Sequence, residues 1–462
     1  MGKKVNKMSI KKILGIIILL NIAGLLAINF FPYPENFVYP YLTSHGLIPY
    51  KQIFDQHFPG LLFFPINFYS LGMRTPEDAR FWLLATVVIN HILIFLLSGK
   101  LFKSKWYILP NLLYAVFQPF FEGYVLWIDS IAPIFLLTGA YFLITKDKEE
   151  LKIRHYLLSG LFLGIGIVFK QIFLPIVGLV FIYLFLKEKN KSKALAFLIF
   201  PTILTSLLFI YMKGRGVWDD FWFWTVKFNA TTFAKFGRKY PSVGELAKTS
   251  LVFGFGLVSW VYIILKDWSH NKVVLGLFLV GGLMFAYARF DFVHLQPALP
   301  FAVLIISLFL EKVPKNKYLL KGIGVWVLIT GLIVIRFYKM NVGNSVYFFG
   351  DKEAKLSQEV EKYAKPGESV FAFATTPAIY PMTNTLPSGH IFVFDFPWFM
   401  MEAQTRVLLG LESDPPKVVI KDDNAIIDGM KFIDYMQDIN IYIEKKYKTV
   451  GTIDGIKIMI PR

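Results

Sequence analysis

Side chains that could perform acid–base or anion-binding chemistry gather in alternate connections between the apolar runs of this chain. The candidate residues are Glu35, Asp55, His57, Glu122, Asp129, Lys170, Gln171, Arg289, Asp291 and His294. The intervening connections are rich in lysine and contain little else that could react. We therefore expect one face of the molecule to hold an active site.

The first reactive connection, residues 31–60, is the densest. It offers Glu35, Asp55 and His57 among tyrosines and prolines. A carboxylate within hydrogen-bond reach of a hydroxyl group can remove its proton, so Glu35 and Asp55 are candidate bases and His57 is a candidate substrate ligand. The alternative is an ordinary interfacial loop, where tyrosines and polar groups collect without reacting. His45 fits that alternative better.

Two later carboxylates, Glu122 and Asp129, flank the sequence YVLWI. Either could orient an incoming hydroxyl group for a base on the first connection. Asp129 also begins an apolar run, where a carboxylate can act as the N-cap of a helix. Both interpretations stay open for each residue.

The cations of the reactive connections could bind a phosphate group and stabilise it as it leaves. Lys170, Arg289 and His294 are the candidates. The alternative is that they only end helices, with their polar tips reaching the interface. Lys170 fits that alternative poorly, because the sequence on both sides of it is apolar for the length of a span. Gln171 adjoins it, and Asp291 either pairs with Arg289 or adds a carboxylate.

Long apolar runs must position these residues. The chain has 462 residues, 55% of them hydrophobic and 18% charged, whereas soluble domains carry roughly 25% charged residues. Runs of about 18–20 apolar residues can cross a bilayer core, and about 11 such segments predict a polytopic α-helical membrane protein. The spans are expected at residues 13–31, 81–99, 105–121, 129–145, 155–169, 171–186, 194–212, 248–265, 273–288, 293–311 and 320–337.

The apolar run at residues 155–186 is interrupted by Lys170 and Gln171 near its centre. A single helix of this length would be about 48 Å long, and a lysine at the bilayer centre would cost several kcal/mol. Two short helices that meet at Lys170 avoid both problems. They place the lysine at the outer surface.

The lysine-rich connections predict the sidedness of the membrane domain. Their basic residues are Lys3, Lys4, Lys7, Lys11, Lys12, Lys100, Lys103, Lys105, Lys146, Lys148, Lys152, Arg154, Lys187, Lys189, Lys191, Lys193, Lys312, Lys315, Lys317 and Lys321. All fall on one side of the predicted spans, and an excess of lysine marks the cytoplasmic side. We expect an integral protein of the plasma membrane with a cytoplasmic N-terminus and an extracytoplasmic C-terminal domain.

Two domains are expected. Residues 1–338 form the transmembrane domain, with a first outer loop at 32–80, and residues 339–462 form a small α/β domain because helical and strand patterns alternate there. Its helices are expected at 352–364, 401–411 and 430–447, a turn followed by a strand within 366–374, further strands at 390–396 and 416–422, and a hairpin at 447–462.

Several classes of function are disfavoured. The net charge is +17, but no basic module with interleaved aromatic residues lies outside the spans, so no nucleic-acid partner is expected. The chain has no cysteine, which excludes disulfides, thiolate catalysis and cysteine metal sites. Asp219 and Asp220 are adjacent, and consecutive carboxylates rarely converge on one metal ion.

The order of these motifs resembles the GT-C glycosyltransferases, in the branch that includes protein O-mannosyltransferases and bacterial lipid A aminoarabinose transferases. The matching elements are PEN (34–36), GLIPYKQIFDQHFPG (46–60), the acids Glu122 and Asp129, GIGIVFKQ (164–171) and RFDFVHLQPALP (289–300). The resemblance extends over residues 1 to about 340 and more loosely over the outer domain.

The resemblance implies a polyprenyl-phosphate sugar as donor and chemistry on the non-cytoplasmic side, usually with inversion. Glu35 lies at the acidic motif of the first outer loop, and Asp55 at a second acidic position before a proline. Pro34 stands where the commoner motif has Asp, which leaves open whether Glu35 or Asp55 is the base. Some relatives bind a divalent metal ion at this loop, so a metal ion also stays open.

The basic residues take the other role that the resemblance implies. Lys170, Arg289 and His294 would face the phosphate group of the donor lipid. Together these expectations describe a cell-envelope enzyme that works beside the lipid headgroups.

We therefore predict a membrane glycosyltransferase that transfers a sugar from a polyprenyl-phosphate donor to a glycan, lipid or protein acceptor. The alternative is a lipid-linked saccharide flippase or transporter without covalent chemistry. Transporters usually contain internal repeats with paired broken helices, and the sequence offers no convincing repeat.

Overall fold

The computed structural model describes residues 7–146, 150–312 and 317–462. Four lysines used above to predict sidedness, Lys3, Lys4, Lys148 and Lys315, lie outside these ranges. The chain divides into two compact units. The helical unit comprises Met1–Phe30, Arg80–Leu208 and Lys239–Ser345, and the α/β unit comprises Phe31–Ala79, Phe209–Arg238 and Val346–Arg462.

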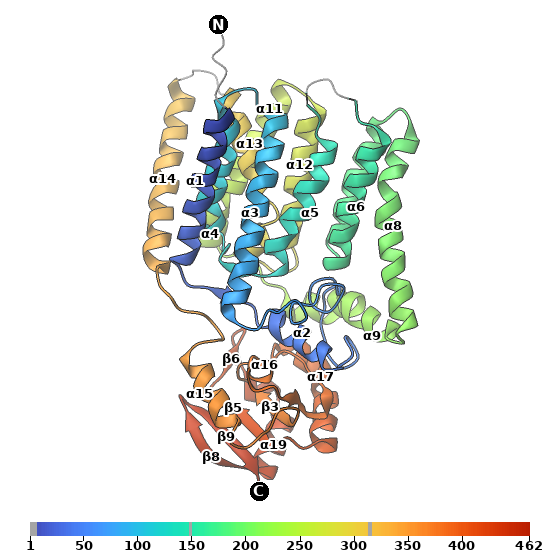
Figure 1. Ribbon diagram of the computed structural model, residues 1–462, viewed down its shortest axis with the longest axis vertical. Coiled ribbons are helices and arrows are strands. Elements are labelled where there is room, and N and C mark those ends of the chain that lie inside the picture. The colour runs from blue at the N-terminus through green and yellow to red at the C-terminus, as the bar shows by residue number, and fades with distance from the viewer. Residues whose placement is uncertain (1–6, 147–149, 313–316) are drawn as a thin grey trace. The chain divides into compact units, whose positions relative to one another are not determined.

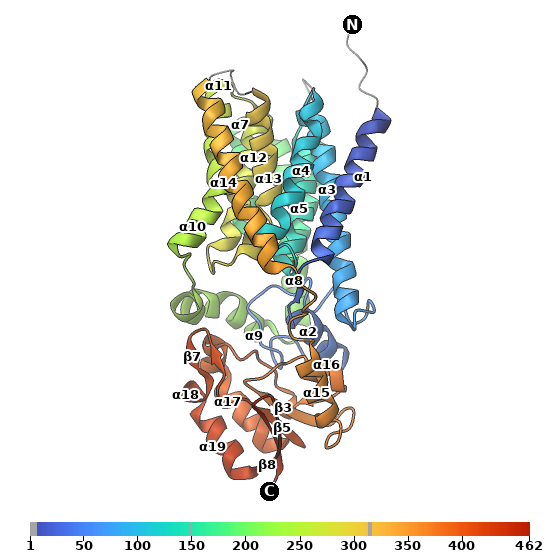
Figure 2. The same ribbon diagram turned by 90° about the vertical axis from the view of Figure 1, so that its left-hand side faces the viewer.

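Apolar helices that run alongside one another build the helical unit (Figures 1 and 2). They are α1 (Lys7–Leu26), α3 (Pro76–Leu101), α4 (Leu109–Phe120), α5 (Ile128–Leu143), α6 (Ile153–Phe169), α7 (Phe173–Lys187), α8 (Lys191–Gly214), α10 (Val243–Thr249), α11 (Phe255–Lys266), α12 (His270–Leu283), α13 (Leu299–Lys312) and α14 (Lys317–Asn341). Helix α13 is buried from Leu299 to Phe309 and packs against α4, α11 and α12. It is the core of this unit.

The outer surface of the helical unit is apolar. Four helical segments are long and apolar enough to cross a membrane: Pro76–Leu101, Lys191–Gly214, Val243–Lys266 and Lys317–Asn341. On α14, Leu328 and Leu332 are 62% and 60% exposed. An apolar helix face of this kind is stable only when lipid or protein covers it, so the chain is a helical membrane protein.

The sequence-predicted spans agree with these helices in position. Each of the eleven predicted ranges overlaps at least one helical segment of the described chain. The predicted break at Lys170 is confirmed, because α6 ends at Phe169 and α7 begins at Phe173. The number of helices that cross the bilayer stays a prediction.

The two ends of the helical unit differ in chemistry. At one end, Lys100 donates to the carbonyl oxygens of Tyr141 and Ile144, where α3 and α5 finish. The helices then reverse direction, so the starts of α5 and α13 lie at the opposite end (Figure 1). That opposite end holds Asp129 in the first turn of α5.

The α/β unit is organised around a five-stranded sheet with strand order β4-β3-β5-β9-β8. The strands are β3 (Ser369–Phe373), β4 (Leu386–Pro387), β5 (Val418–Lys421), β8 (Tyr447–Ile453) and β9 (Ile456–Pro461). β3 pairs in parallel with β4 and β5, whereas β9 pairs antiparallel with β5 and β8. The predicted C-terminal hairpin is confirmed.

The α/β unit contains further helices and short strands. They are β1 (Phe31–Pro32), α2 (Glu35–Ser44), α9 (Trp218–Trp222), α15 (Asp351–Val360), α16 (Ile379–Thr383), α17 (Pro397–Ser413), β6 (Ile426–Ile427), β7 (Met430–Lys431), α18 (Phe432–Tyr435) and α19 (Gln437–Lys446). Two π-helical segments, Phe223–Lys227 and Asn229–Gly237, follow α9. The single helix predicted at 430–447 is wrong, since β7, α18 and α19 share that segment.

The unit boundaries differ from the predicted domains. Helix α14 continues to Asn341, and the α/β unit begins again at Val346 rather than at residue 339. The first outer loop also belongs to the α/β unit, because Phe54 N donates to Phe392 O at 3.1 Å and Phe392 N to Gln52 O at 2.7 Å. The strand predicted at 390–396 is therefore wrong: this segment pairs with the loop at a single bridge, Ile53 with Phe392, instead of joining the sheet.

Candidate active-site residues

A buried ion-pair cluster lies in the helical unit. Lys170 Nζ donates to both carboxylate oxygens of Asp129, at 2.9 and 2.7 Å. His294 Nδ1 lies 3.1 Å from Asp129 Oδ1. Asp129 is fully buried, and Lys170 is 8% exposed. Three predicted site residues that are far apart in the sequence therefore meet at one point, and the carboxylate fixes the positions of both basic groups.

Local backbone structure explains why Lys170 lies at this point. It follows the last residue of α6 in an extended conformation, while its N–H still bonds to Gly166 O at 2.9 Å. A side chain at Gly166 would come within 2.4 Å of the Phe173 ring. The glycine thus lets α7 start directly against the end of α6, with the lysine at the junction. Gln171 is half-buried in the same turn.

The N-cap interpretation of Asp129 is wrong. Trp127 occupies the N-cap of α5, and Asp129 lies inside the first turn. Its carboxylate is taken by Lys170 and His294 instead of by the helix backbone. The positive end of the α5 dipole still favours the negative charge at this position.

Further charged residues surround the turn before α13. Arg289 Nε lies 3.4 Å from Asp291 Oδ2, and Lys239 Nζ lies 2.7 Å from Asp291 Oδ1. Asp291 therefore pairs with Arg289, the first of the two options left open by the sequence. Glu122, which has a positive φ of 57°, accepts a hydrogen bond from Val293 N at 3.1 Å. Burial, together with the nearby charge of Asp291, raises the pKa of the Glu122 carboxyl group.

Lys248 was missed by the sequence analysis. Its Nζ lies 3.7 Å from the Phe292 ring centre and 4.4 Å from that of Phe120. The rings of Phe121 and Phe337 are also within 6 Å, at 5.7 and 5.5 Å. Aromatic faces attract a cation in this geometry, so Lys248 is held beside Glu122 and Phe292. Its position at the start of a predicted span was the available signal.

Asp55 is the centre of a second cluster, in the α/β unit. Its Oδ1 accepts from His57 N at 2.7 Å and lies 3.0 Å from His57 Nδ1, and its Oδ2 accepts from Tyr39 OH at 3.0 Å. Asp55 is only 2% exposed. Both carboxylate oxygens are therefore already held by donors, and Tyr39 is a further residue that sequence analysis missed.

The Tyr39 contact can be tested by mutation. A hydrogen bond to a charged acceptor is worth about 1.5–3 kcal/mol, and Tyr39→Phe removes this one while keeping the ring that packs on Phe63 at 5.1 Å. We expect the free energy of unfolding to fall by that amount, measured by thermal unfolding in nanodiscs. The matched Tyr347→Phe variant, at a half-exposed ring, should change stability little; an equal loss in both would remove the special role of Tyr39.

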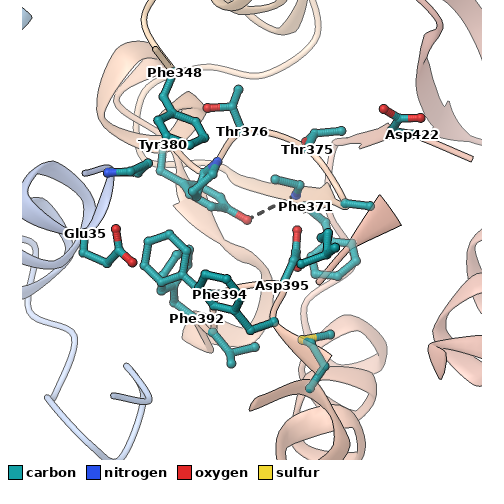
Figure 3. Close-up of a pocket in the computed structure, with 18 of the residues that line it drawn as sticks. Glu35, Phe348, Phe371, Thr375, Thr376, Tyr380, Phe392, Phe394, Asp395 and Asp422 are labelled. Carbon is teal, nitrogen blue, oxygen red and sulfur yellow. Dashed lines mark hydrogen bonds between the residues drawn. The ribbon is translucent and has the colours of Figure 1, made fainter. Parts of the chain in front are cut away.

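Glu35 has a different environment from Asp55. It lies in the first turn of α2, is 8% exposed, and its Oε2 has no hydrogen-bond partner among the described residues. Burial raises the pKa of this carboxyl group to about 8, with a smaller contribution from the charge of Asp55. Glu35 also lines a cavity of about 400 Å³ inside the α/β unit (Figure 3).

The predicted site residues thus form two groups. Glu35, Asp55 and His57 belong to the α/β unit. The helical unit contains Glu122, Asp129, Lys170, Gln171, Arg289, Asp291 and His294. The contacts given above for each group lie within a single unit.

The resemblance left a divalent metal ion open. In the described parts of the chain, no group of three or more histidine, cysteine, aspartate or glutamate side chains could hold one. Asp220 instead lies 3.3 Å from Arg406. We assign no step to a metal ion.

Comparison with known proteins identifies the fold. No family model and no curated protein sequence matches the chain. Among solved structures, ArnT from Cupriavidus metallidurans bound to undecaprenyl phosphate aligns over 98% of both chains with a TM-score of 0.63 and 9% identity. This chain shares the fold of ArnT. The GT-C resemblance predicted from motif order is confirmed at the level of the fold.

Two other structures support the fold assignment. ArnT in the apo state aligns over 96% of both chains, with a TM-score of 0.64 and 11% identity. The archaeal oligosaccharyltransferase AglB from Archaeoglobus fulgidus, in complex with an inhibitory peptide and a dolichol-phosphate, aligns with a TM-score of 0.53 and 10% identity. That match covers 91% of this chain and 70% of AglB. At these identities the likeness is one of fold.

Proposed function

We propose that this protein is a membrane glycosyltransferase that transfers a sugar from a polyprenyl-phosphate donor to an acceptor hydroxyl group. The observation that carries the proposal is the collection of basic groups at one end of the helical unit, centred on the buried pair of Lys170 and Asp129. Fold alone does not fix function. The ArnT and AglB structures add support because each contains a polyprenyl phosphate.

The helical unit would bind the donor phosphate. When the bond between the anomeric carbon and the phosphate oxygen breaks, negative charge develops on the phosphate group, and preorganised cations stabilise it. Lys170 and His294 are held in place by Asp129, so little reorganisation is needed. Arg289 and Lys248 would add positive charge, and Glu122 would hold the backbone of the turn through Val293.

The α/β unit would supply the base. Glu35 has an unused carboxylate oxygen among the described residues, whereas both oxygens of Asp55 already accept hydrogen bonds. We therefore assign proton removal to Glu35 and a positioning role to Asp55, with His57 and Tyr39 as its partners. A single displacement by the deprotonated hydroxyl group would invert the anomeric centre.

The membrane arrangement belongs to the same proposal. The lysine-rich end of the helical unit would face the cytoplasm, with about 11 helices crossing the plasma membrane. The C-terminal α/β domain would then be extracytoplasmic. Accessibility labelling of single introduced cysteines in this cysteine-free chain would test the sidedness directly.

Transfer can be tested with purified protein in nanodiscs and a panel of polyprenyl-phosphate sugars. We expect release of polyprenyl phosphate with at least one donor, and a rate at least about 100-fold lower for Asp55→Asn, the loss typical of a damaged acid–base site. The exposed Asp438→Asn variant should retain the wild-type rate.

The same experiment separates the enzyme from the alternative function. Translocation of an intact donor across a proteoliposome membrane, without cleavage of any sugar–phosphate bond, would identify a flippase. An unchanged rate in Asp55→Asn would remove Asp55 from the site.

A further inference from the structure

The α/β unit contains a cavity at the ends of its parallel strands. The cavity has a volume of about 400 Å³, within the roughly 300–1,000 Å³ range of small-molecule sites. It lies beyond the carboxyl ends of two parallel strands: Thr375 follows β3, and Asp422 follows β5. The chain moves from β3 to β4 on one side and then to β5 on the other. Such a reversal of strand order is where open α/β sheets bind ligands.

Aromatic rings form much of the cavity wall. The ring centres of Phe392 and Phe394 are 5.1 Å apart, and those of Tyr380 and Phe392 are 5.7 Å apart. Phe371 and Phe348 line the cavity as well (Figure 3). Flat apolar faces of this kind can stack against the C–H face of a ring-shaped ligand.

Polar groups without partners are directed into the same space. Glu35 Oε2 and Thr375 Oγ1 are buried, and neither has a hydrogen-bond partner among the described residues. The Tyr380 hydroxyl oxygen accepts from Ala372 N at 3.2 Å, which leaves its own hydrogen available to donate. Figure 3 shows the Glu35 carboxyl group pointing toward the Phe392 and Phe394 rings. Buried polar atoms are rarely left unpaired, so these groups point to a ligand.

Asp395 contributes a second carboxyl group. Its side chain lines the cavity from the segment between Phe394 and Phe396, and Figure 3 places it on the Tyr380 side. Burial raises the pKa of Asp395 well above its ordinary value. Burial thus favours the neutral form of Asp395, as it does for Glu35, and a neutral carboxyl group can both donate and accept a hydrogen bond.

We propose that this cavity binds a saccharide ring, the acceptor of the transfer reaction, with Asp395, Thr375 and Tyr380 binding its hydroxyl groups and the phenylalanine rings packing on its C–H face. The inference rests on the proposed function and names the substrate class of that reaction. It also places an acceptor hydroxyl group beside the free oxygen of Glu35.

A saccharide fits this cavity better than an amine. An ammonium ligand would need ionised carboxylates, whereas both Glu35 and Asp395 favour their neutral forms because they are buried. Lys352, Glu353 and Asp422 also line the cavity, so charged groups of both signs are present there. Hydrogen-bonding groups beside aromatic faces suit a ring of hydroxyl groups.

Saturation-transfer NMR can test the assignment without a donor. The full-length protein is placed in nanodiscs free of glycoside detergents, and methyl glycosides of common hexoses and pentoses serve as probes, with trimethylammonium as the cation probe. We expect saturation of the ring C–H protons of at least one glycoside by the wild-type protein. Asp395→Ala and Thr375→Val should each weaken its affinity at least 5-fold.

Thr375→Val keeps the side-chain shape and removes only the unpaired hydroxyl group. A loss of binding in this variant is therefore not explained by misfolding. Asp438→Ala and Thr452→Val, at exposed positions, are the matched controls and should bind like the wild type. Equal glycoside binding in all variants, no binding of any glycoside, or stronger binding of trimethylammonium would each overturn the proposal. Glycoside binding without any sugar transfer would overturn the proposed function and leave the cavity assignment intact. Sugar transfer without glycoside binding at this cavity would overturn the cavity assignment and leave the proposed function intact.

Discussion

Glu35→Gln is expected to reduce the rate of sugar transfer by about 100- to 10,000-fold, the contribution typical of a general base. Glutamine keeps the size of the side chain but cannot accept a proton. Because Glu35 Oε2 has no hydrogen-bond partner among the residues described, the substitution breaks no recorded contact of that oxygen and should leave the protein folded. The rate is measured as release of polyprenyl phosphate.

The pH dependence of transfer gives a second signature of the same residue. Burial raises the pKa of Glu35 to about 8, and only the ionised form can take a proton. The wild-type kcat/KM should therefore rise with pH and level off above about 8. Other titratable residues of the same cavity are Lys352, Glu353, Tyr380, Asp395 and Asp422, so the residual activity of Glu35→Gln must be followed over the same range.

Two outcomes would contradict the assignment of Glu35. A rate within a factor of a few of the wild type would exclude it as the base. A wild-type profile that stays flat from pH 6 to 9 would shift the role toward a carboxylate that is ionised throughout. The exposed Glu361→Gln variant is the matched control and should reproduce the wild-type profile.

The stability of the α/β unit should also respond to Glu35. A carboxyl group whose pKa is raised on folding binds more protons in the folded protein than in the unfolded chain. Its contribution is therefore present at low pH and is lost as pH rises from about 4.5 toward 8. Activity and stability should therefore show opposite pH trends at this site, and Glu35→Gln should remove the loss of stability, measured by thermal unfolding over the same pH range.

The helical part of the fold was accessible from sequence because span length and hydrophobicity are local properties. The break at Lys170 followed from one charged residue in a run too long for a single span. The convergence of Asp129, Lys170 and His294 at one end of the helical unit follows from the alternation of helix direction. Their pairing with one another depends on side-chain packing, which no local pattern encodes.

The set of chain segments that pack together in the α/β unit could not be predicted in this way. Phe54 stacks on Trp224 at 4.9 Å, and Phe228 stacks on Phe399 at 5.2 Å. These contacts join segments that are about 170 residues apart, and nothing in either segment specifies its partner. Asp395 was missed for a related reason. The alternation in HIFVFDF is the same for an edge strand and for a loop that packs between a cavity and another loop.

Lys170 has two roles that mutation can separate, because the lysine is both a structural partner of Asp129 and a proposed phosphate ligand. Lys170→Met leaves Asp129, which is fully buried, without its main counter-charge. Breaking one side of a buried ion pair typically costs about 3–5 kcal/mol. We expect the free energy of unfolding in nanodiscs to fall by this amount. Lys312→Met, whose side chain is 45% exposed and lies 3.5 Å from Asp267, should lose at most about 1 kcal/mol.

A double variant separates the two roles. Asp129→Asn in the Lys170→Met background removes the uncompensated charge, so stability should return most of the way to that of the wild type. Affinity for undecaprenyl phosphate should stay low, because the cation that binds its phosphate group is still missing. Recovery of both stability and lipid affinity in the double variant would mean that Lys170 serves Asp129 alone. The phosphate would then have to be bound by Arg289, His294 or Lys248.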